Sequence, residues 1–287
     1  VEESLAAKKR LVEQELERVL FREDSLLFRA MRYAVFSGGK RFRPLLLLGS
    51  GACFGVRRAV LLPFACALEL IHNYSLIHDD LPAMDDDDFR RGRLSCHKAF
   101  GEDIALLAGD GLLTLAFELM SGADVPPEIG PRKQEAVRMI SRAAGVSGMI
   151  GGQFLDITLD PEKLTEELLE ELVIKKTGAL ITAAVEAAAV LAGAGRLERK
   201  AISDFGRHLG LAFQVRDDIL DARKKGSKKR PWRPDYAAFL GLDKAKRRLE
   251  ELVHRAVAFL DKASLKAEEL RYLALSLLAL KPEAFHG

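Results

Sequence analysis

Two clusters of aspartate lie within otherwise apolar stretches of this chain, and any fold must bring their charges to a place that tolerates them. The first cluster spans residues 79–88 and the second spans residues 217–221. Burying an unpaired carboxylate is costly, so acids held close together need positive charge between them. Magnesium takes oxygen ligands and is commonly held by one or two carboxylates together with substrate phosphates. The clusters therefore predict a site for magnesium bridged to phosphate oxygens.

Helical signals dominate the rest of the sequence. Near the N-terminus, apolar residues recur at helical spacing, at Leu5, Val12, Leu16, Val19 and Leu20. Ala, Leu, Glu, Lys and Arg, which favour helices, fill most segments, whereas strand-like alternation and Asn-Gly or Asp-Gly hairpin signals are scarce. No linker-like stretch divides the 287 residues. We expect an all-α fold, with residues 1–287 forming a single-domain bundle of about ten or more helices.

Two long apolar runs, residues 59–77 and 104–120, have the length of membrane spans. They are interrupted by polar or charged side chains, at Glu69, His72, Asn73, Asp110 and Glu118. A bilayer helix of about 20 residues tolerates such groups poorly. We expect both runs to be buried helices that carry polar groups toward an internal cavity, with no stable membrane insertion.

Composition argues against several other classes. A net charge of +2 is too close to neutral to favour nucleic acid as a partner, despite the basic stretch at residues 224–233. The N-terminal residues lack the basic and apolar regions of a secretory signal. The three cysteines form no CxxC pair, which favours reduced thiols. We expect a cytoplasmic protein that binds no nucleic acid.

The second cluster has the simpler geometry. Asp217 and Asp221 are four residues apart, so on a helix they share one face, where like charges destabilise a bare helix. Solvated acids on an exposed face are the alternative interpretation. The apolar residues upstream, at 211–215, favour a buried wall, with Gln214 as a polar exception.

The first cluster contains Pro82, which disrupts a regular helix. We expect Asp79 and Asp80 at the end of a helix over residues 65–78, and Asp85 to be brought back by the following turn. Arg90 and Arg91 come next in the sequence. Arginine there could neutralise the acids or bind phosphate oxygens as a fork.

A third element is the sequence Gly-Gly-Lys-Arg-Phe-Arg-Pro at residues 38–44. Glycine lets the backbone approach an anion, and three cations adjoin it. The pattern is not a P-loop, and alone it indicates no more than a basic turn. Residues 175–178 form a weaker anion-site candidate. Taken together, the elements predict one diphosphate held through metal, a second held directly by Lys and Arg, and apolar helices for a hydrocarbon tail.

Ordered motifs carry a resemblance over nearly the whole chain. They occupy residues 38–44, 77–92, 96–101, 107–114, 151–156, 176–180 and 213–221. In these segments the chain resembles the trans-prenyltransferases, or short-chain isoprenyl diphosphate synthases of the polyprenyl synthetase type, and most of all the bacterial farnesyl diphosphate synthases.

This resemblance implies an all-helical domain around a deep central cavity, assembled as a homodimer, with three Mg²⁺ ions as cofactor. The implied reaction joins an allylic diphosphate, dimethylallyl or geranyl, to isopentenyl diphosphate, releasing diphosphate and forming farnesyl diphosphate (C15). A geranylgeranyl diphosphate (C20) synthase is the first alternative. A terpene cyclase is the second, although a cyclase needs no second diphosphate site at residues 39–43. A catalytically dead regulatory subunit is disfavoured by the intact Asp79, Asp85 and Asp217.

The resemblance also implies a role for each matching residue. The implied metal ligands are Asp79, Asp80, Asp85, Asp217, Asp218 and Asp221. The implied contacts of the allylic diphosphate are Arg90, Lys176, Thr177 and Gln214. The implied contacts of isopentenyl diphosphate are Gly39, Lys40, Arg43, His72 and Arg91. The residues expected to be catalytic are Asp79, Asp85, Asp217 and Lys176.

Product length should depend on the floor of the cavity. Tyr74 lies about a turn and a half before Asp79 on the expected helix. An aromatic residue at this place, followed here by Ser75, resembles C15 synthases, whereas core packing is the alternative role for Tyr74.

Residues 222–234 depart from the family pattern, because this basic loop is several residues shorter than expected. Lys225, Lys228 and Lys229 are the candidates to replace the usual loop lysines, and the loop could close over a bound diphosphate.

Overall fold

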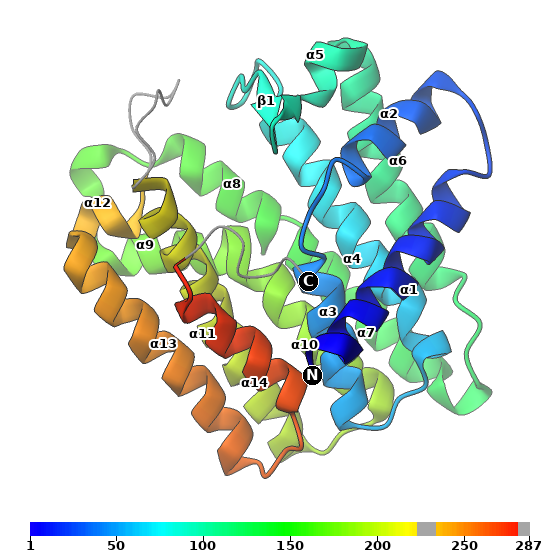
Figure 1. The fold of residues 1–287 in the computed structure, drawn as a ribbon, viewed down its shortest axis with the longest axis vertical. Coiled ribbons are helices and arrows are strands. Elements are labelled where there is room, and N and C mark those ends of the chain that lie inside the picture. Colours follow the sequence, from blue (N-terminus) through cyan, green and yellow to red (C-terminus); the bar gives the residue numbers. More distant parts are fainter. Residues whose placement is uncertain (223–233, 281–287) are drawn as a thin grey trace.

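The structure, a computed structural model, describes residues 1–222 and 234–280 and is built almost entirely of helices (Figure 1). The first half contains α1 (Glu2–Leu20), α2 (Leu26–Val35), α3 (Phe42–Cys53), α4 (Arg58–Asp79), β1 (Phe89–Arg90), β2 (Arg93–Leu94), α5 (Cys96–Phe100), α6 (Glu102–Ser121), η1 (Pro127–Ile129) and α7 (Gly130–Ala144). The second half contains α8 (Met149–Thr158), η2 (Pro161–Lys163), α9 (Glu166–Val173), η3 (Ile174–Gly178), α10 (Ala179–Ala192), α11 (Arg196–Ala222), α12 (Tyr236–Leu240), α13 (Leu242–Lys262), α14 (Glu268–Leu275) and η4 (Ser276–Leu278). The all-α prediction is confirmed.

Helix α10 lies at the centre of the packing, against α3, α7 and α11. Its sequence is rich in alanine, and its alanines at 183, 184 and 187–189 are buried. Small side chains let helix axes approach closely. Glycine on α11 does the same, because a Cβ on Gly210 would lie 2.6 Å from the Cα of Gly178 and a Cβ on Gly206 would lie 2.9 Å from the Cα of Thr182. This close packing fixes α11, which carries the second aspartate cluster, against η3.

Helix α4 carries the first cluster at its C-terminal end and packs against α3 and α6. Both α4 and α6 have the length and hydropathy of membrane spans, although the core helices of many proteins meet the same test. In α4, 72% of the most apolar window is buried inside the fold, compared with 39% in α6. The apolar run at residues 59–77 thus forms a buried core helix, as expected, while α6 keeps much apolar surface exposed.

The hairpin β1–β2 is a feature that the sequence analysis missed. Phe89 pairs with Leu94 and Arg90 with Arg93 in antiparallel register. The two residues between the strands, Arg91 and Gly92, have positive φ values of 53° and 77°. Positive φ at both central residues is the requirement of a type I′ turn, whose twist matches that of the two strands it joins. Arg-Gly is not one of the usual turn pairs, so only Gly92 could have signalled this hairpin. The basic stretch at residues 223–233, with its candidate lysines, lies outside the described residues.

Candidate active site

A cavity of about 660 Å³ lies between α4, α6, α8 and η3. Most of its exposed lining is apolar, from side chains such as Leu76, Leu113, Met149 and Phe154. The predicted site residues that border it are Arg43, His72, Tyr74, Ser75, Asp79, Lys176 and Thr177. Cationic, acidic and apolar groups that are far apart in the sequence therefore share one pocket.

The first aspartate cluster begins where α4 ends and then folds back on itself. The amide of Asp85 donates a hydrogen bond to the carbonyl oxygen of Asp79 at 2.8 Å, and the amide of Met84 donates to that of Leu81 at 2.9 Å. Pro82 cannot continue the helix, and these backbone bonds close the turn. The structure therefore brings Asp79 and Asp85 together, as the sequence suggested.

The two adjacent acids of this cluster have different surroundings. The carboxylate of Asp80 is buried and accepts hydrogen bonds from Arg90, with Nε at 2.9 Å. Asp79 instead borders the cavity. Burial and the nearby Asp85 raise the pKa of Asp79 to about 6, although Lys176 opposes the shift. Asp80 is thus neutralised within the protein, while Asp79 faces the cavity with its charge only partly compensated.

The second cluster shows the same division on one helix. Asp218 is buried, and its two oxygens accept hydrogen bonds from Nε2 of Gln214 and from the amide of Tyr236, each at 2.8 Å. Asp217 is half-buried, with its carboxylate 3.5 Å from the guanidinium of Arg216. Burial raises the pKa of Asp217 to about 6, with Asp221 adding to the shift and Arg216 opposing it. Asp218 therefore has a structural partner on each oxygen.

The π-helical turn η3 presents Lys176 and Thr177 to the cavity. Nζ of Lys176 donates to Asp156 of α8 at 2.8 Å, and Oγ1 of Thr177 donates to Oε1 of Gln214 at 2.8 Å. Because Gln214 also donates to Asp218, one chain of hydrogen bonds runs from η3 into the second cluster. Single π-helical turns occur often at functional sites. The predicted Lys176, Thr177 and Gln214 are thus brought together.

The basic turn at residues 38–43 reaches the cavity through Arg43. Arg43 is buried and borders the cavity, and its Nε has no hydrogen-bond partner among the residues that the structure describes. Burial lowers the pKa of Lys40, and Asp217 opposes that shift, so Lys40 lies in the field of the second cluster. Burial and the neighbouring Arg43 lower the pKa of His72 well below its usual value, which leaves its imidazole neutral at pH 7.

Arg91, which lies in the turn between β1 and β2, adds a further cation next to the basic turn. Its guanidinium donates a hydrogen bond to the carbonyl oxygen of Gly38. A Cβ on Gly39 would lie 2.9 Å from Nη1 of Arg91, and Gly39 has a φ of 134°, so this position requires glycine. Of the residues predicted for the second diphosphate, Arg43 and His72 border the cavity, and Arg91 packs against Gly39 in the basic turn that also carries Lys40.

Two polar residues of α8 lie in the motif at residues 151–156, to which the sequence analysis gave no role. Gln153 borders the cavity, and neither polar atom of its side-chain amide finds a hydrogen-bond partner within residues 1–222 and 234–280. Asp156 is buried and holds Lys176. The signal was the preceding glycine pair, because a Cβ on Gly152 would lie 2.2 Å from the amide nitrogen of Lys176. Gly152 thus lets α8 lie directly against η3.

The donor set can be tested against the expected metal. In the described part of the chain, no three His, Cys, Asp or Glu side chains form a ready-made metal cluster. The acids instead lie in two clusters. Burial is the main cause of the raised pKa values of Asp79 and Asp217, so a bound cation would offset the cost of their charge. This arrangement fits Mg²⁺, which uses few carboxylates when phosphate oxygens complete its shell.

Comparison with known proteins agrees with this architecture. The Polyprenyl synthetase family model matches residues 24–235. The chain is 44% identical over 262 residues to the farnesyl diphosphate synthase of Geobacillus stearothermophilus, with 87% of each chain covered. It is 43% identical over 235 residues to the farnesyl diphosphate synthase of Escherichia coli (strain K12), with 79% of each covered. The solved geranyltransferase from Legionella pneumophila matches with a TM-score of 0.86 at 36% identity, over 96% of this chain and 95% of that one. On its sequence and its fold, this chain belongs to the polyprenyl synthetase family.

Proposed function

We propose that this protein is a magnesium-dependent trans-prenyltransferase that condenses dimethylallyl or geranyl diphosphate with isopentenyl diphosphate to form farnesyl diphosphate. The observation that carries the proposal is the cavity itself. Asp79 and Lys176 border it together with Arg43 and His72, and its remaining wall is largely apolar. Such a pocket suits two diphosphates and one hydrocarbon chain.

The allylic diphosphate is assigned to the acidic side of the site. Asp79, Asp85 and Asp217 would hold Mg²⁺ there, and Asp80, Asp218 and Asp221 complete the two clusters. When bound, magnesium supplies Lewis-acid polarisation of the departing diphosphate. Lys176 is held by Asp156 at the edge of the cavity, where its ammonium can bind the same diphosphate. Arg90, Thr177 and Gln214 are assigned as further contacts of the allylic diphosphate.

Isopentenyl diphosphate is assigned to the basic side. Lys40, Arg43 and Arg91 supply positive charge, and Gly39 lets the backbone approach the anion. Because the pKa of His72 is lowered, a neutral imidazole offers one N–H donor there without adding charge. Buried guanidinium groups bind diphosphate oxygens as forks, which fixes the orientation of the bound group.

The reaction then follows from this placement. The C–O bond of the allylic substrate breaks, its electron pair leaves with the diphosphate, and an allylic carbocation forms in the apolar cavity. The double bond of isopentenyl diphosphate attacks this carbon, and a proton leaves the resulting cation for the released diphosphate. Holding the two reactants in contact supplies much of the rate. Among the protein groups, the cations stabilise the departing diphosphate electrostatically.

Product length is assigned to Tyr74, which is buried on α4, borders the cavity and packs edge-on against His78 at 5.6 Å between ring centroids. A buried phenol ring at this place would stop chain growth at C15. A smaller residue would leave room for the C20 product of the alternative synthase. Ser75, which also borders the cavity, is assigned to the same floor.

A homodimer and a cytoplasmic location complete the proposal. Helix α6 buries only 39% of its most apolar window, and it leaves Leu107, which does not line the cavity, at 52% exposure. An apolar helix face left exposed in this way suits contact with a second copy of the chain. The whole sequence, residues 1–287, would act as one catalytic domain.

Product analysis tests the proposal. The protein is incubated with labelled isopentenyl diphosphate, Mg²⁺ and each allylic starter in turn, and the products are identified by mass. Farnesyl diphosphate is the expected product, formed only when magnesium is present. Release of a cyclic hydrocarbon without consumption of isopentenyl diphosphate would favour the terpene cyclase instead, and a C20 product would favour the longer-chain synthase.

A further inference from the structure

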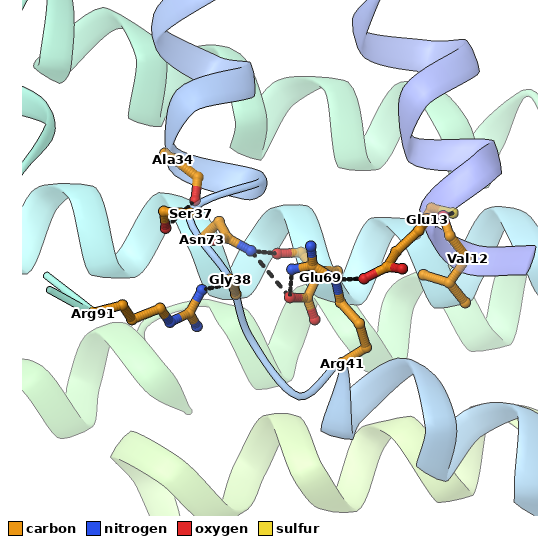
Figure 2. Close-up of polar contacts among 10 residues, drawn as sticks. Val12, Glu13, Ala34, Ser37, Gly38, Arg41, Glu69, Asn73 and Arg91 are labelled. Carbon is orange, nitrogen blue, oxygen red and sulfur yellow. Dashed lines mark hydrogen bonds and ion pairs between the residues drawn. The ribbon is translucent and has the colours of Figure 1, made fainter. Parts of the chain in front are cut away.

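A buried polar network lies behind the basic turn, among side chains that do not border the cavity (Figure 2). Arg41 precedes α3 with a left-handed φ of 51° and points toward α4. Its Nη1 donates a hydrogen bond to Oε1 of Glu69 at 2.8 Å, and its Nε lies 3.5 Å from Oε1 of Glu13. The guanidinium of Arg41 is thus directed to carboxylates rather than to the site.

Glu69 is itself held in one orientation. Nδ2 of Asn73, one helical turn along α4, donates to the carbonyl oxygen of Glu69 at 2.8 Å and to its Oε1 at 3.3 Å. The side chains of Arg41 and Glu69 are each only 2% exposed. A buried ion pair is often no more stabilising than well-packed apolar side chains of the same size. Stability alone therefore does not account for this pair, and the conformation that it imposes is the better explanation.

The network fixes the geometry of the basic turn from two ends. At one end, Arg91 donates to the carbonyl oxygen of Gly38, as Figure 2 shows. At the other end, Glu69 holds Arg41. Lys40 lies between these two anchors, and a residue without glycine's freedom could not adopt the φ of 104° found at Gly38.

The Arg41–Glu69 pair lies close in sequence to two residues of the cavity wall. Arg41 points toward α4, whereas Arg43, two residues later, is buried at the cavity wall. On α4, Glu69 is followed three residues later by His72, which borders the same cavity. A shift of the Arg41–Glu69 pair would therefore move Arg43 relative to His72.

We infer that Glu69 is a positioning residue, which sets the backbone of residues 38–43 through Arg41 and so places Lys40 and Arg43 for isopentenyl diphosphate. Glu69 touches no substrate itself. The inference rests on the proposed function. It assigns the pair to isopentenyl diphosphate, because the groups that the network holds, Arg41 and the carbonyl oxygen of Gly38, belong to the turn that carries Lys40 and Arg43.

Steady-state kinetics of Glu69→Gln test the inference. Loss of the charge leaves the buried Arg41 to pair with the more distant Glu13, at 3.5 Å, so the turn relaxes. The KM for isopentenyl diphosphate should rise about tenfold or more, while the KM for geranyl diphosphate stays within about twofold and kcat falls less than about fivefold. The Asn73→Ala variant keeps both charges but removes the support of Glu69. It should raise the same KM by about threefold, and it serves if Glu69→Gln fails to fold.

Glu269→Gln is the matched control. Glu269 pairs with the buried Lys8 and lies away from the basic turn, near Gly49 of α3, where an added Cβ would be 3.4 Å from its Oε2. Its loss should lower Tm without changing either KM. The inference is overturned if Glu69→Gln and Asn73→Ala lower Tm but leave both KM values unchanged or raise them equally, as a purely structural role would. Absence of turnover in the wild-type enzyme would remove the proposed function and this inference with it, whereas normal wild-type turnover with an unaltered KM in the variants would remove only the inference.

Discussion

The two aspartate clusters place their acids through different local structures. The first lies in a loop after α4, folded back so that the amide of Asp85 reaches the carbonyl oxygen of Asp79. The second stays on α11, where Asp217 and Asp221 are one turn apart. The loop depends on backbone hydrogen bonds around Pro82, whereas the helix needs only its own register. A carboxylate pair can thus be built from a turn or from a helix face.

The clusters also share a division of labour between neighbours. Asp80 is paired with Arg90, and Asp218 bonds to Gln214 and Tyr236. The residue before each of them is less enclosed, because Asp79 borders the cavity and the side chain of Asp217 is 41% exposed. Adjacent acids in a motif therefore have unequal surroundings, and the more accessible acid is the better candidate to meet a metal ion.

The largest effect should come from Asp217, the acid of α11 that is proposed to bind magnesium. We expect Asp217→Ala to lower kcat by about a hundredfold or more, the scale of losing one strong electrostatic contact in a transition state. Steady-state turnover with geranyl and isopentenyl diphosphates measures it. Asp204→Ala is the control on the same helix, since within residues 1–222 and 234–280 the Asp204 carboxylate pairs with the exposed Lys200 and its loss should leave kcat unchanged. Near-native turnover in Asp217→Ala would remove this residue from the catalytic set.

The second prediction concerns a difference between the two helices that carry the clusters. Helix α4 carries Tyr74, the proposed cavity floor, as well as the acids at its end, whereas α11 carries the second cluster. Tyr74→Ala should enlarge the cavity and shift the main product from C15 to C20 or longer. Tyr272→Ala on α14, whose hydroxyl bonds Glu2, is the control and should keep the C15 product. If Tyr74→Ala still made only C15, another residue would form the floor.

A third prediction concerns the compensated neighbour in the second cluster. Asp218→Ala removes both acceptors and leaves the buried amide of Tyr236 unbonded. The free energy of unfolding should fall by about 2 kcal/mol, the typical cost of an unsatisfied buried donor. Urea unfolding of the ligand-free protein measures it. An unchanged unfolding midpoint together with a kcat loss as large as that of Asp217→Ala would show that the two acids do not differ as the structure indicates.

The smallest effect is a dependence of stability on pH. Because folding raises the pKa of Asp217 from about 3.9 to about 6, the folded protein binds more protons between these values and loses stability as pH rises through that window. Asp217→Asn should therefore raise Tm at pH 7 by about 2 °C in the absence of ligand. The gain should vanish near pH 4, where the wild-type carboxyl is protonated. A lower Tm for Asp217→Asn at pH 7 would contradict this.

Much of the fold and site could be predicted from the sequence because the evidence was local. The helical period of the apolar residues is visible over short windows, and so is the break that Pro82 makes after Asp79. The same holds for the helical spacing of Asp217 and Asp221. These features are set by neighbours a few residues away, and the structure has them where the sequence indicated.

The rest depends on partners distant in the sequence. Asp218 bonds to an amide 18 residues later, and Arg41 pairs with Glu69 28 residues away. Neither motif contains a signal for its distant partner. The sequence therefore could not predict which acid has a hydrogen-bond partner and which is exposed. The role of Gln153 at the cavity wall likewise depends on how closely Gly152 lets α8 approach η3.

The most direct test is a crystal structure of the protein with Mg²⁺ and the unreactive analogue geranyl thiodiphosphate. We predict metal ions on the diphosphate with the carboxylates of Asp79, Asp85 and Asp217 around them, and the hydrocarbon chain directed toward Tyr74. A structure in which these carboxylates turn away from the bound diphosphate, or the chain lies outside the cavity, would contradict it.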